Sequence, residues 1–217
     1  MSKDRDLQED VMAELNWEPS VTAAHIGVTA KDGVIALTGH VDNYMQKNAA
    51  EAAAGRVKGV KAVAEELEVR YPYDSKRSDE DIAAAAVNRL SWSVSVPKDA
   101  VKVKVENGWV TLTGEVEWHY QKTAAADDVR GLYGVVGVSN EMTLKSSVNT
   151  NDISDNIRKA LHRSWFFDPE TINVTAVGGK IKLTGTVDSW HDKEVAGTTA
   201  WAAHGATTVE NNLSVVF

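Results

Sequence analysis

The residues best suited to catalysis or metal binding lie along this sequence without the spacing that either chemistry requires. The six histidines form no His-x-x-x-His or Glu-x-x-His pair, and His40 has the carboxylate of Asp42 close to it along the chain. Zinc sites depend on such spacings. The chain has no cysteine, which excludes thiolate metal sites, disulfides and cysteine nucleophiles. We expect no cofactor and no repeated metal site; a metal site formed between distant segments stays an open alternative.

Two further patterns resemble active-site motifs without meeting their requirements. Gly178-Gly179-Lys180 is similar to part of a phosphate-binding loop, but the GxxxxGK[ST] spacing is missing and a hairpin tip is expected there. The carboxylate pairs Glu65-Glu66 and Asp127-Asp128 fall on predicted solvent faces, where nothing distinguishes one carboxyl as an acid and the other as a base. We interpret the chain as a non-enzyme.

Aromatic residues are more informative, because they suit binding rather than catalysis. The sequence has seven tryptophans, and rings gather where a helix is expected to begin, at Tyr44, at Trp118 and Tyr120, and at Trp190. One interpretation is that these rings hold the helix against a sheet. The other is that they form a contact surface for a membrane or a protein partner. A lysine follows each group (Lys47, Lys122 and Lys193), and it could meet a phosphate or pair with a neighbouring carboxylate.

The most basic patch is formed by Lys98, Lys102 and Lys104. Lys102 and Lys104 share one face of a predicted strand, because side chains alternate along a strand. An anionic phospholipid surface is the partner that such a patch fits. If any part of the chain touches anionic lipid, we expect it to be this one. Trp109 and Trp118 lie in the same part of the sequence, and each is either an interfacial anchor or a core residue.

Charge and hydropathy limit the possible partners and locations. The chain carries 23 basic and 31 acidic residues, a formal net charge of −8, which opposes nucleic-acid binding through phosphate neutralisation. No apolar run approaches the ~20 residues of a transmembrane helix, and none follows the N-terminus as a secretory signal requires. We therefore expect no transmembrane segment and a cytoplasmic location, or a periplasmic one if a leader has been removed.

The elements that position these residues repeat three times. A shift of 75 residues aligns Leu37-Thr38-Gly39 with residues 112–114, and a further 71 aligns it with residues 183–185. The register holds without a gap from residue 6 to residue 69. Twelve residues recur unchanged in both later repeats: Asp6, Leu15, Val28, Gly33, Leu37, Thr38, Gly39, Val41, Lys47, Ala50, Gly59 and Val63. A length of 217 residues by itself suggests one or two domains, but the repeats predict three, at residues 1–70, 78–145 and 151–217.

Each repeat predicts the order α-β-β-α-β. Apolar residues at i, i+4 and i+8, as in Leu7, Val11 and Leu15, predict the first helix, and Asp6, Asp81 and Asp152 are expected at its start in the three repeats. Two alternating strands follow, joined by the turn pairs Asp32-Gly33, Asn107-Gly108 and Gly178-Gly179. An alanine-rich second helix is expected to end with Gly59, Gly134 and Gly205 at the C′ position, before a last strand. The fold class is α+β: three tandem units, each a three-stranded mixed sheet with two helices on one face.

A glycine interrupts the second strand near its end in every repeat, at Gly39, Gly114 and Gly185. Such a glycine indicates a bulge or the close approach of another backbone. We expect that backbone to be the helix that follows; a bound ligand is the alternative explanation.

Taken together, the hairpin ending in Leu-Thr-Gly-x-Val, the lysine-bearing helix, the Gly-Val pair and the closing Val-x-x-x-Leu-x-Val resemble the BON domain family, named after bacterial osmotically inducible protein Y and nodulation proteins. The resemblance covers almost the whole chain, three times. It implies a bacterial, non-enzymatic, stress- or envelope-associated binding protein, with osmotic stress as the usual setting. The family is commonly held to bind phospholipid surfaces, and one cytoplasmic member binds potassium ions.

Three functions follow as hypotheses. The leading one is a binding module at phospholipid or protein surfaces. The others are an intracellular sensor of potassium or another ion, built from backbone carbonyls that leave no side-chain signature, and a scaffold that presents repeats to a protein partner. The sequence departs from the osmotically inducible pattern in its three domains and its lack of a recognisable signal peptide.

Overall fold

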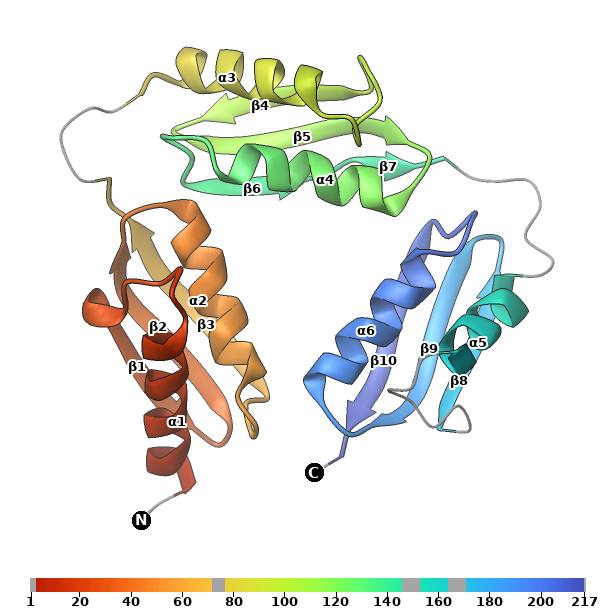
Figure 1. Ribbon diagram of the computed structural model, residues 1–217, viewed down its shortest axis with the longest axis horizontal. Coiled ribbons are helices and arrows are strands. Elements are labelled where there is room, and N and C mark those ends of the chain that lie inside the picture. The colour runs from red at the N-terminus through yellow and green to blue at the C-terminus, as the bar shows by residue number, and fades with distance from the viewer. Residues whose placement is uncertain (1–2, 72–76, 146–152, 164–170, 217) are drawn as a thin grey trace. The chain divides into compact units, whose positions relative to one another are not determined.

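The computed structural model describes residues 3–71, 77–145, 153–163 and 171–216. Along them the α-β-β-α-β order occurs three times, as the sequence predicts (Figure 1). The first repeat contains α1 (Lys3–Trp17), β1 (Ile26–Lys31), β2 (Val34–Val41), α2 (Tyr44–Arg56) and β3 (Ala62–Val69), with a short 3₁₀ helix, η1 (Ala23–His25), directly before β1. The second contains α3 (Asp79–Trp92), β4 (Val101–Glu106), β5 (Trp109–Val116), α4 (His119–Arg130), β6 (Gly137–Asn140) and β7 (Thr143–Leu144). The third contains α5 (Ile153–Arg163), β8 (Ile172–Val177), β9 (Lys180–Val187), α6 (Trp190–Trp201) and β10 (Thr208–Val215).

Each repeat has a mixed sheet with the second strand at its centre. In the first repeat β1 pairs antiparallel with β2 and β3 pairs parallel with it, in the order β1-β2-β3. The third repeat has the same arrangement, with β9 between β8 and β10. In the second repeat the last strand is broken into β6 and β7, which both lie beside β5. The α+β class with a mixed sheet in each repeat is thereby confirmed.

Both helices of a repeat cover the same face of its sheet. In the first repeat Leu7, Val11 and Leu15 of α1 are buried in one cluster with Ile35 and Leu37 of β2. Small residues of α2 complete that core (Ala50, Ala53 and Ala54). The third repeat is built in the same way, with Ile153, Ile157 and Leu161 of α5 against β9. Alternate side chains of each strand point to the opposite, uncovered side, which we call the open face.

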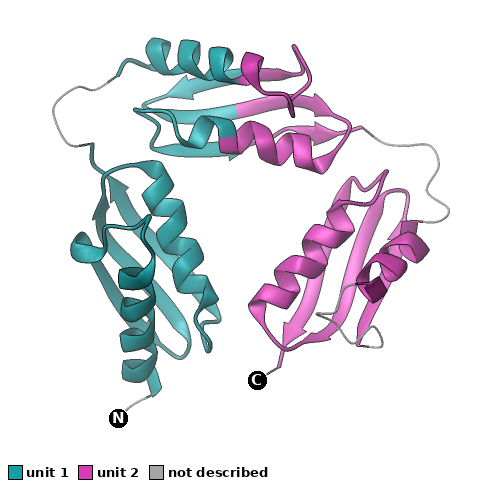
Figure 2. Cartoon of the chain, in the orientation of Figure 1, with its two compact units in different colours: residues 1–89, 103–111, 128–139 teal, residues 90–102, 112–127, 140–217 magenta. Residues whose placement is uncertain are grey.

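By contact density the chain divides into two compact units rather than three (Figure 2). One unit contains residues 1–89, 103–111 and 128–139, and the other contains residues 90–102, 112–127 and 140–217. The second repeat is therefore shared between the two units. The domain boundaries 1–70, 78–145 and 151–217 stay a prediction.

The first helix begins with acidic residues where it is described. Asp6 lies in the first turn of α1 and Asp81 in that of α3, where a carboxylate favours the positive end of the helix dipole. Ser78 caps α3: its hydroxyl accepts a hydrogen bond from the Asp81 amide at 3.1 Å and donates one to the Asp81 carboxylate at 2.8 Å. Asp152, expected at the same place in the third repeat, lies outside the described residues.

The strand glycines are confirmed as points of close backbone approach, but the expected neighbour is wrong. Gly39, Gly114 and Gly185 have φ of 111°, 137° and 126°. A Cβ at each would collide with a backbone carbonyl oxygen, that of His25, Ala100 or Thr171 respectively. These residues directly precede the first strand of the hairpin, and are not part of the following helix. The reason is register, since Gly39 lies opposite Ile26, the first residue of β1.

The glycines after the second helix also differ from expectation. Gly59, Gly134 and Gly205 have positive φ, but α2 ends at Arg56 with Val57 as its C-cap, and α6 ends at Trp201 with Ala202 as its C-cap. Each glycine therefore lies beyond the C′ position. It reverses the chain in the turn that leads to the last strand.

Candidate functional site

The described residues contain no cluster of metal-ligating side chains. Within residues 3–71, 77–145, 153–163 and 171–216, no group of three or more His, Cys, Asp or Glu side chains lies close enough to hold a metal ion. None of the helices in these segments has the length and apolar character needed to cross a bilayer. Gly178 and Gly179 form a hairpin tip between β8 and β9, with φ of 57° and 81°. The features left to consider are surfaces.

The three candidate lysines of the second repeat lie on or next to β4. Lys102 and Lys104 are exposed on its open face, and Lys98 is exposed just before the strand. The Lys104 ammonium pairs with the Glu106 carboxylate at 2.9 Å, and both side chains are about two-thirds exposed. An ion pair so exposed contributes little to stability, and it lowers the local positive charge.

Trp109 is an open-face residue rather than a core residue. It is the first residue of β5 and is 47% exposed. Its indole Nε1 donates a hydrogen bond to the Ser139 hydroxyl at 2.9 Å, and its ring lies across Gly137, where a Cβ would collide with the ring. The equivalent pairs are Val34 with Ala62 and Lys180 with Thr208. Only the second repeat therefore has both the indole and the glycine that makes room for it.

The rings at the helix starts do not form one surface. In the second compact unit Trp118 is half-buried and meets His204 edge-on, with ring centroids 4.8 Å apart. Tyr120 is 57% exposed. Trp190 is 37% exposed, and the Lys193 ammonium lies 5.0 Å from its ring centroid. Trp118 is thus covered in part by a ring of the third repeat, whereas Tyr120 and Trp190 are accessible.

His119, next to Trp118, is part of the same aromatic contact. Its ring stacks on Trp201 with centroids 4.1 Å apart and planes 16° apart. Burial lowers the pKa of His119, and the nearby Lys122 charge lowers it further. The neutral imidazole is therefore the form that this stack favours.

The repeated lysine of the second helix is joined to the last strand by a carboxylate in the first repeat and by an asparagine in the second and third. Lys47 pairs with the Glu65 carboxylate at 2.9 Å and donates to the Leu67 carbonyl oxygen at 2.7 Å. Asn140 and Asn211 replace Glu65, and each donates its amide to the backbone carbonyl of the lysine, Lys122 or Lys193, at 2.6 Å. Of the two roles considered for this lysine, pairing with a carboxylate holds in the first repeat.

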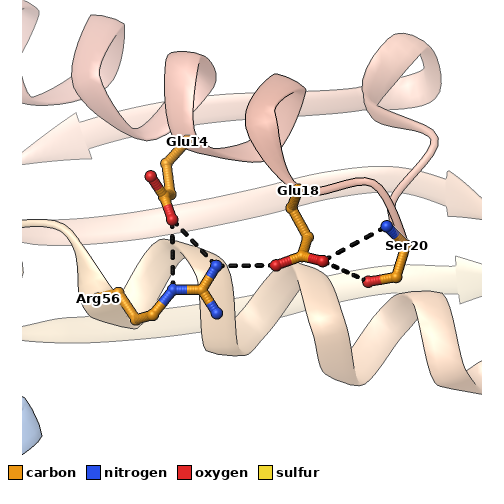
Figure 3. Close-up of polar contacts among 4 residues, drawn as sticks. All are labelled: Glu14, Glu18, Ser20 and Arg56. Atoms are coloured by element: carbon orange, nitrogen blue, oxygen red, sulfur yellow. Dashed lines mark hydrogen bonds and ion pairs between the residues drawn. The ribbon is translucent and has the colours of Figure 1, made fainter.

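Figure 3 shows the ionic contact that joins the two helices of the first repeat. The Arg56 guanidinium on α2 donates to Glu14 at 2.9 and 3.2 Å and to Glu18 at 2.8 Å. Glu18 also accepts hydrogen bonds from the amide and hydroxyl of Ser20. The bond from Arg56, followed by those from Ser20, lowers the pKa of Glu18, and the bonds to Glu18 and Glu14 raise that of Arg56. The second repeat reverses the polarity, with Arg89 on α3 and Asp128 at 3.2 Å. These contacts are structural.

Two cations of the third repeat escaped the sequence analysis. Lys180 and Lys182 are exposed at alternate positions of β9. Within the described segments neither ammonium has an ion-pair partner. The alternation Lys-Ile-Lys-Leu is the sequence signal that places both lysines on one face of the strand.

The sequence matches a known family over nearly its whole length. A model of the BON domain matches residues 3–71, 78–146 and 149–216. The chain belongs to the BON domain family. The resemblance inferred from the repeated motifs is therefore confirmed, in three tandem copies.

Other similarities are weaker. Osmotically-inducible protein Y of Escherichia coli (strain K12) is 27% identical over 121 residues, which is 52% of this chain and 60% of that protein. Two structures of CdsD, described as a structural protein of the type III secretion system of Chlamydia trachomatis, align over 97% and 100% of this chain. The identity is 17% in both, and the TM-scores are 0.27 and 0.28. With TM-scores this low, nothing about this chain follows from either alignment.

Proposed function

We propose that this chain is a non-catalytic binding protein of the bacterial stress response that attaches to anionic phospholipid surfaces. The observation that carries the proposal is the open face of the second repeat. Trp109 is held flat on it by Gly137 and Ser139, next to a strand that bears Lys102 and Lys104. An indole with one polar end suits the headgroup region of a bilayer, and lysines suit its negative charge.

Family membership and the similarity to an osmotically inducible protein support the stress role. That similarity spans 60% of the relative's length, so the physiological setting is part of the proposal. The net charge of −8 means that an anionic bilayer repels the chain as a whole. Attachment must therefore come from local patches, and it must weaken as salt screens them.

Cosedimentation with phosphatidylglycerol vesicles tests the proposal. The triple variant Lys98→Glu, Lys102→Glu and Lys104→Glu should bind at least tenfold more weakly than the wild type, because each lysine near an anionic surface contributes about 1 kcal/mol. Its melting temperature should hardly change, because all three side chains are exposed. Unchanged binding by the triple variant would exclude this face. Equal binding of the wild type to neutral vesicles would point to the exposed rings Tyr120 and Trp190 instead.

A further inference from the structure

We propose that the hairpin of the third repeat, β8 and β9 with the turn between them, is a second contact for anionic phospholipid, and that it binds a bilayer more strongly than β4 of the second repeat. This inference rests on the proposed function. It is based on the charge, register and exposure of residues within the third repeat.

Two cations on β9 have no ion-pair partner among the described residues. Lys180 lies between Val177 on β8 and Thr208 on β10, and Lys182 lies between Thr175 and Glu210. Because the lysines are two residues apart on one strand, they share the open face and are separated by roughly 6.6 Å along it. Lys104, in contrast, pairs with Glu106. The third repeat thus offers two ammonium groups without a carboxylate partner in the part of the chain that the structure describes. On β4 only Lys102 is in that state, because Lys104 is paired with Glu106.

The open face around these lysines carries few other charges. Apart from Glu210 and Val177, the open-face neighbours on the three strands are uncharged hydroxyl and amide side chains: Asn173, Thr175, Thr184, Thr186, Thr208, Asn212 and Ser214. In the first repeat the two lysine positions hold Val34 and Ala36, and the positions of Asn212 and Ser214 hold Glu66 and Glu68. The same backbone therefore presents two glutamates in the first repeat, one of them paired with Arg70, where the third repeat presents an asparagine and a serine beside its two lysines.

The hairpin tip also differs between the repeats. In the first repeat the Asp32 amide donates to the Asp4 carboxylate at 2.9 Å, and in the second the Asn107 and Gly108 amides donate to Asp79 at 2.7 and 2.8 Å. Both tips therefore carry a carboxylate. The equivalent position in the third repeat is Thr150 in the sequence.

The tip of the third repeat is apolar instead. Val177 is 80% exposed, and a Cβ at Gly178 would meet nothing within 4 Å. An exposed apolar tip beside two ammonium groups is complementary to the edge of a bilayer, where negative headgroups overlie hydrocarbon. A soluble anion would leave the tip unused, which is why we assign this surface to a membrane.

Three double variants, each of which removes two positive charges, test the inference in the full-length chain. They are Lys180→Gln with Lys182→Gln, Lys102→Gln with Lys104→Gln, and, as a control on the helix that covers the other face, Lys159→Gln with Arg163→Gln. Glutamine is used because a glutamate at position 182 would lie opposite Glu210. The probe is a vesicle of phosphatidylglycerol and phosphatidylcholine, and circular dichroism melting checks folding.

Each lysine near an anionic surface changes the partition coefficient about fivefold. We expect the Lys180/Lys182 variant to bind ten- to thirty-fold more weakly, the Lys102/Lys104 variant to lose less, and the control to change less than twofold. Val177→Glu, which copies the Glu106 found at that place in the second repeat, should also weaken binding. Glu210→Gln should strengthen it.

Distinct results overturn the inference and the proposed function. If the wild type does not bind anionic vesicles, both are wrong. If it binds and the Lys180/Lys182 variant behaves as the control does, or loses less than the Lys102/Lys104 variant, only the inference is wrong. Equal wild-type binding to pure phosphatidylcholine would also overturn the inference, because it would show that the lysines do not carry the attachment.

Discussion

The first and third repeats share their strand register residue for residue, yet they hold the second helix to the last strand by different means. In the first repeat the contact is ionic, from Lys47 to Glu65, with side chains only 21% and 17% exposed. In the third repeat Asn211 bonds to the backbone of Lys193 instead, and the ammonium moves to the ring of Trp190. The same backbone thus accommodates either contact. The contact determines whether the lysine ammonium pairs with a carboxylate, as in Lys47, or lies over an aromatic ring, as in Lys193.

The largest expected effect should be the same in both repeats. Gly39→Ala and Gly185→Ala each place a Cβ against a backbone carbonyl oxygen at positive φ. Because neither neighbour is a movable side chain, each change should lower the free energy of unfolding of its repeat by about 3 kcal/mol. Hydrogen exchange read by mass spectrometry resolves the repeats within the intact chain. A large effect in one repeat and none in the other would break the equivalence of the two backbones.

The junction itself should show the difference. Glu65→Ala leaves the Lys47 ammonium half-buried without its carboxylate and removes the acceptor of the Leu67 amide, so we expect a loss of about 2 kcal/mol. Asn211→Ala removes neutral hydrogen bonds only, which predicts about 1 kcal/mol. The comparison is made by urea unfolding with repeat-resolved exchange. Equal losses would mean that charge adds nothing at this junction.

A smaller effect is expected at the Arg56 clamp, which the third repeat lacks because Ala202 occupies the equivalent position. Arg56→Ala should cost the first repeat less than about 1 kcal/mol, since the guanidinium is 53% exposed. The pKa of Glu18 is lowered in the folded chain, so its contribution is present above the ordinary value of 4.5 and is lost as the pH falls through the folded value. Hydrogen-exchange rates at pH 7 and pH 3.5 measure this change in stability. The prediction is contradicted if acidification destabilises the first repeat of the wild type no more than that of the Arg56→Ala variant.

The smallest effect should come from Glu65→Asn, which gives the first repeat the residue of the other two. The asparagine can donate to the Lys47 carbonyl and accept from the Leu67 amide, as Asn211 does with Lys193 and Leu213. We expect a change within about 0.5 kcal/mol, because one set of satisfied polar contacts replaces another. Vesicle binding should rise slightly, since Lys47 is released. A loss as large as that of Glu65→Ala would show that the two junctions are not interchangeable.

The sequence predicted the elements well because three versions of each were available. The turn pair Asn107-Gly108 supports Asp32-Gly33, and both have the expected positive φ. The neighbour of Gly39 was missed because it depends on register between strands, which is fixed by hydrogen bonds and not by the pattern within one strand. The partner of Lys47 stayed open for a similar reason, since two glutamates of alternate faces lie side by side at Glu65 and Glu66.

The surfaces were harder to predict than the core. A tryptophan at the start of a strand is compatible with burial or exposure, and Trp109 is placed by Gly137, a residue 28 positions later that carries no pattern of its own. Lys180 and Lys182 were visible as an alternation, but whether a cation is available depends on which carboxylates surround it in space. Core positions repeat because packing constrains them, whereas surface residues differ between repeats.

The side chain at the helix–strand junction also affects how copies of the chain can associate. The last strand of the first and third repeats lies at an edge of its sheet, and its alternate amides point away from the neighbouring strand. Glu65 and Asn211 each accept the outward amide two residues later, that of Leu67 or Leu213, and Asn140 does the same for Met142. With that donor occupied in every repeat, a strand added at this edge would have to displace the side-chain acceptor first. The junction residue thereby makes edge-to-edge pairing between copies of the chain less favourable.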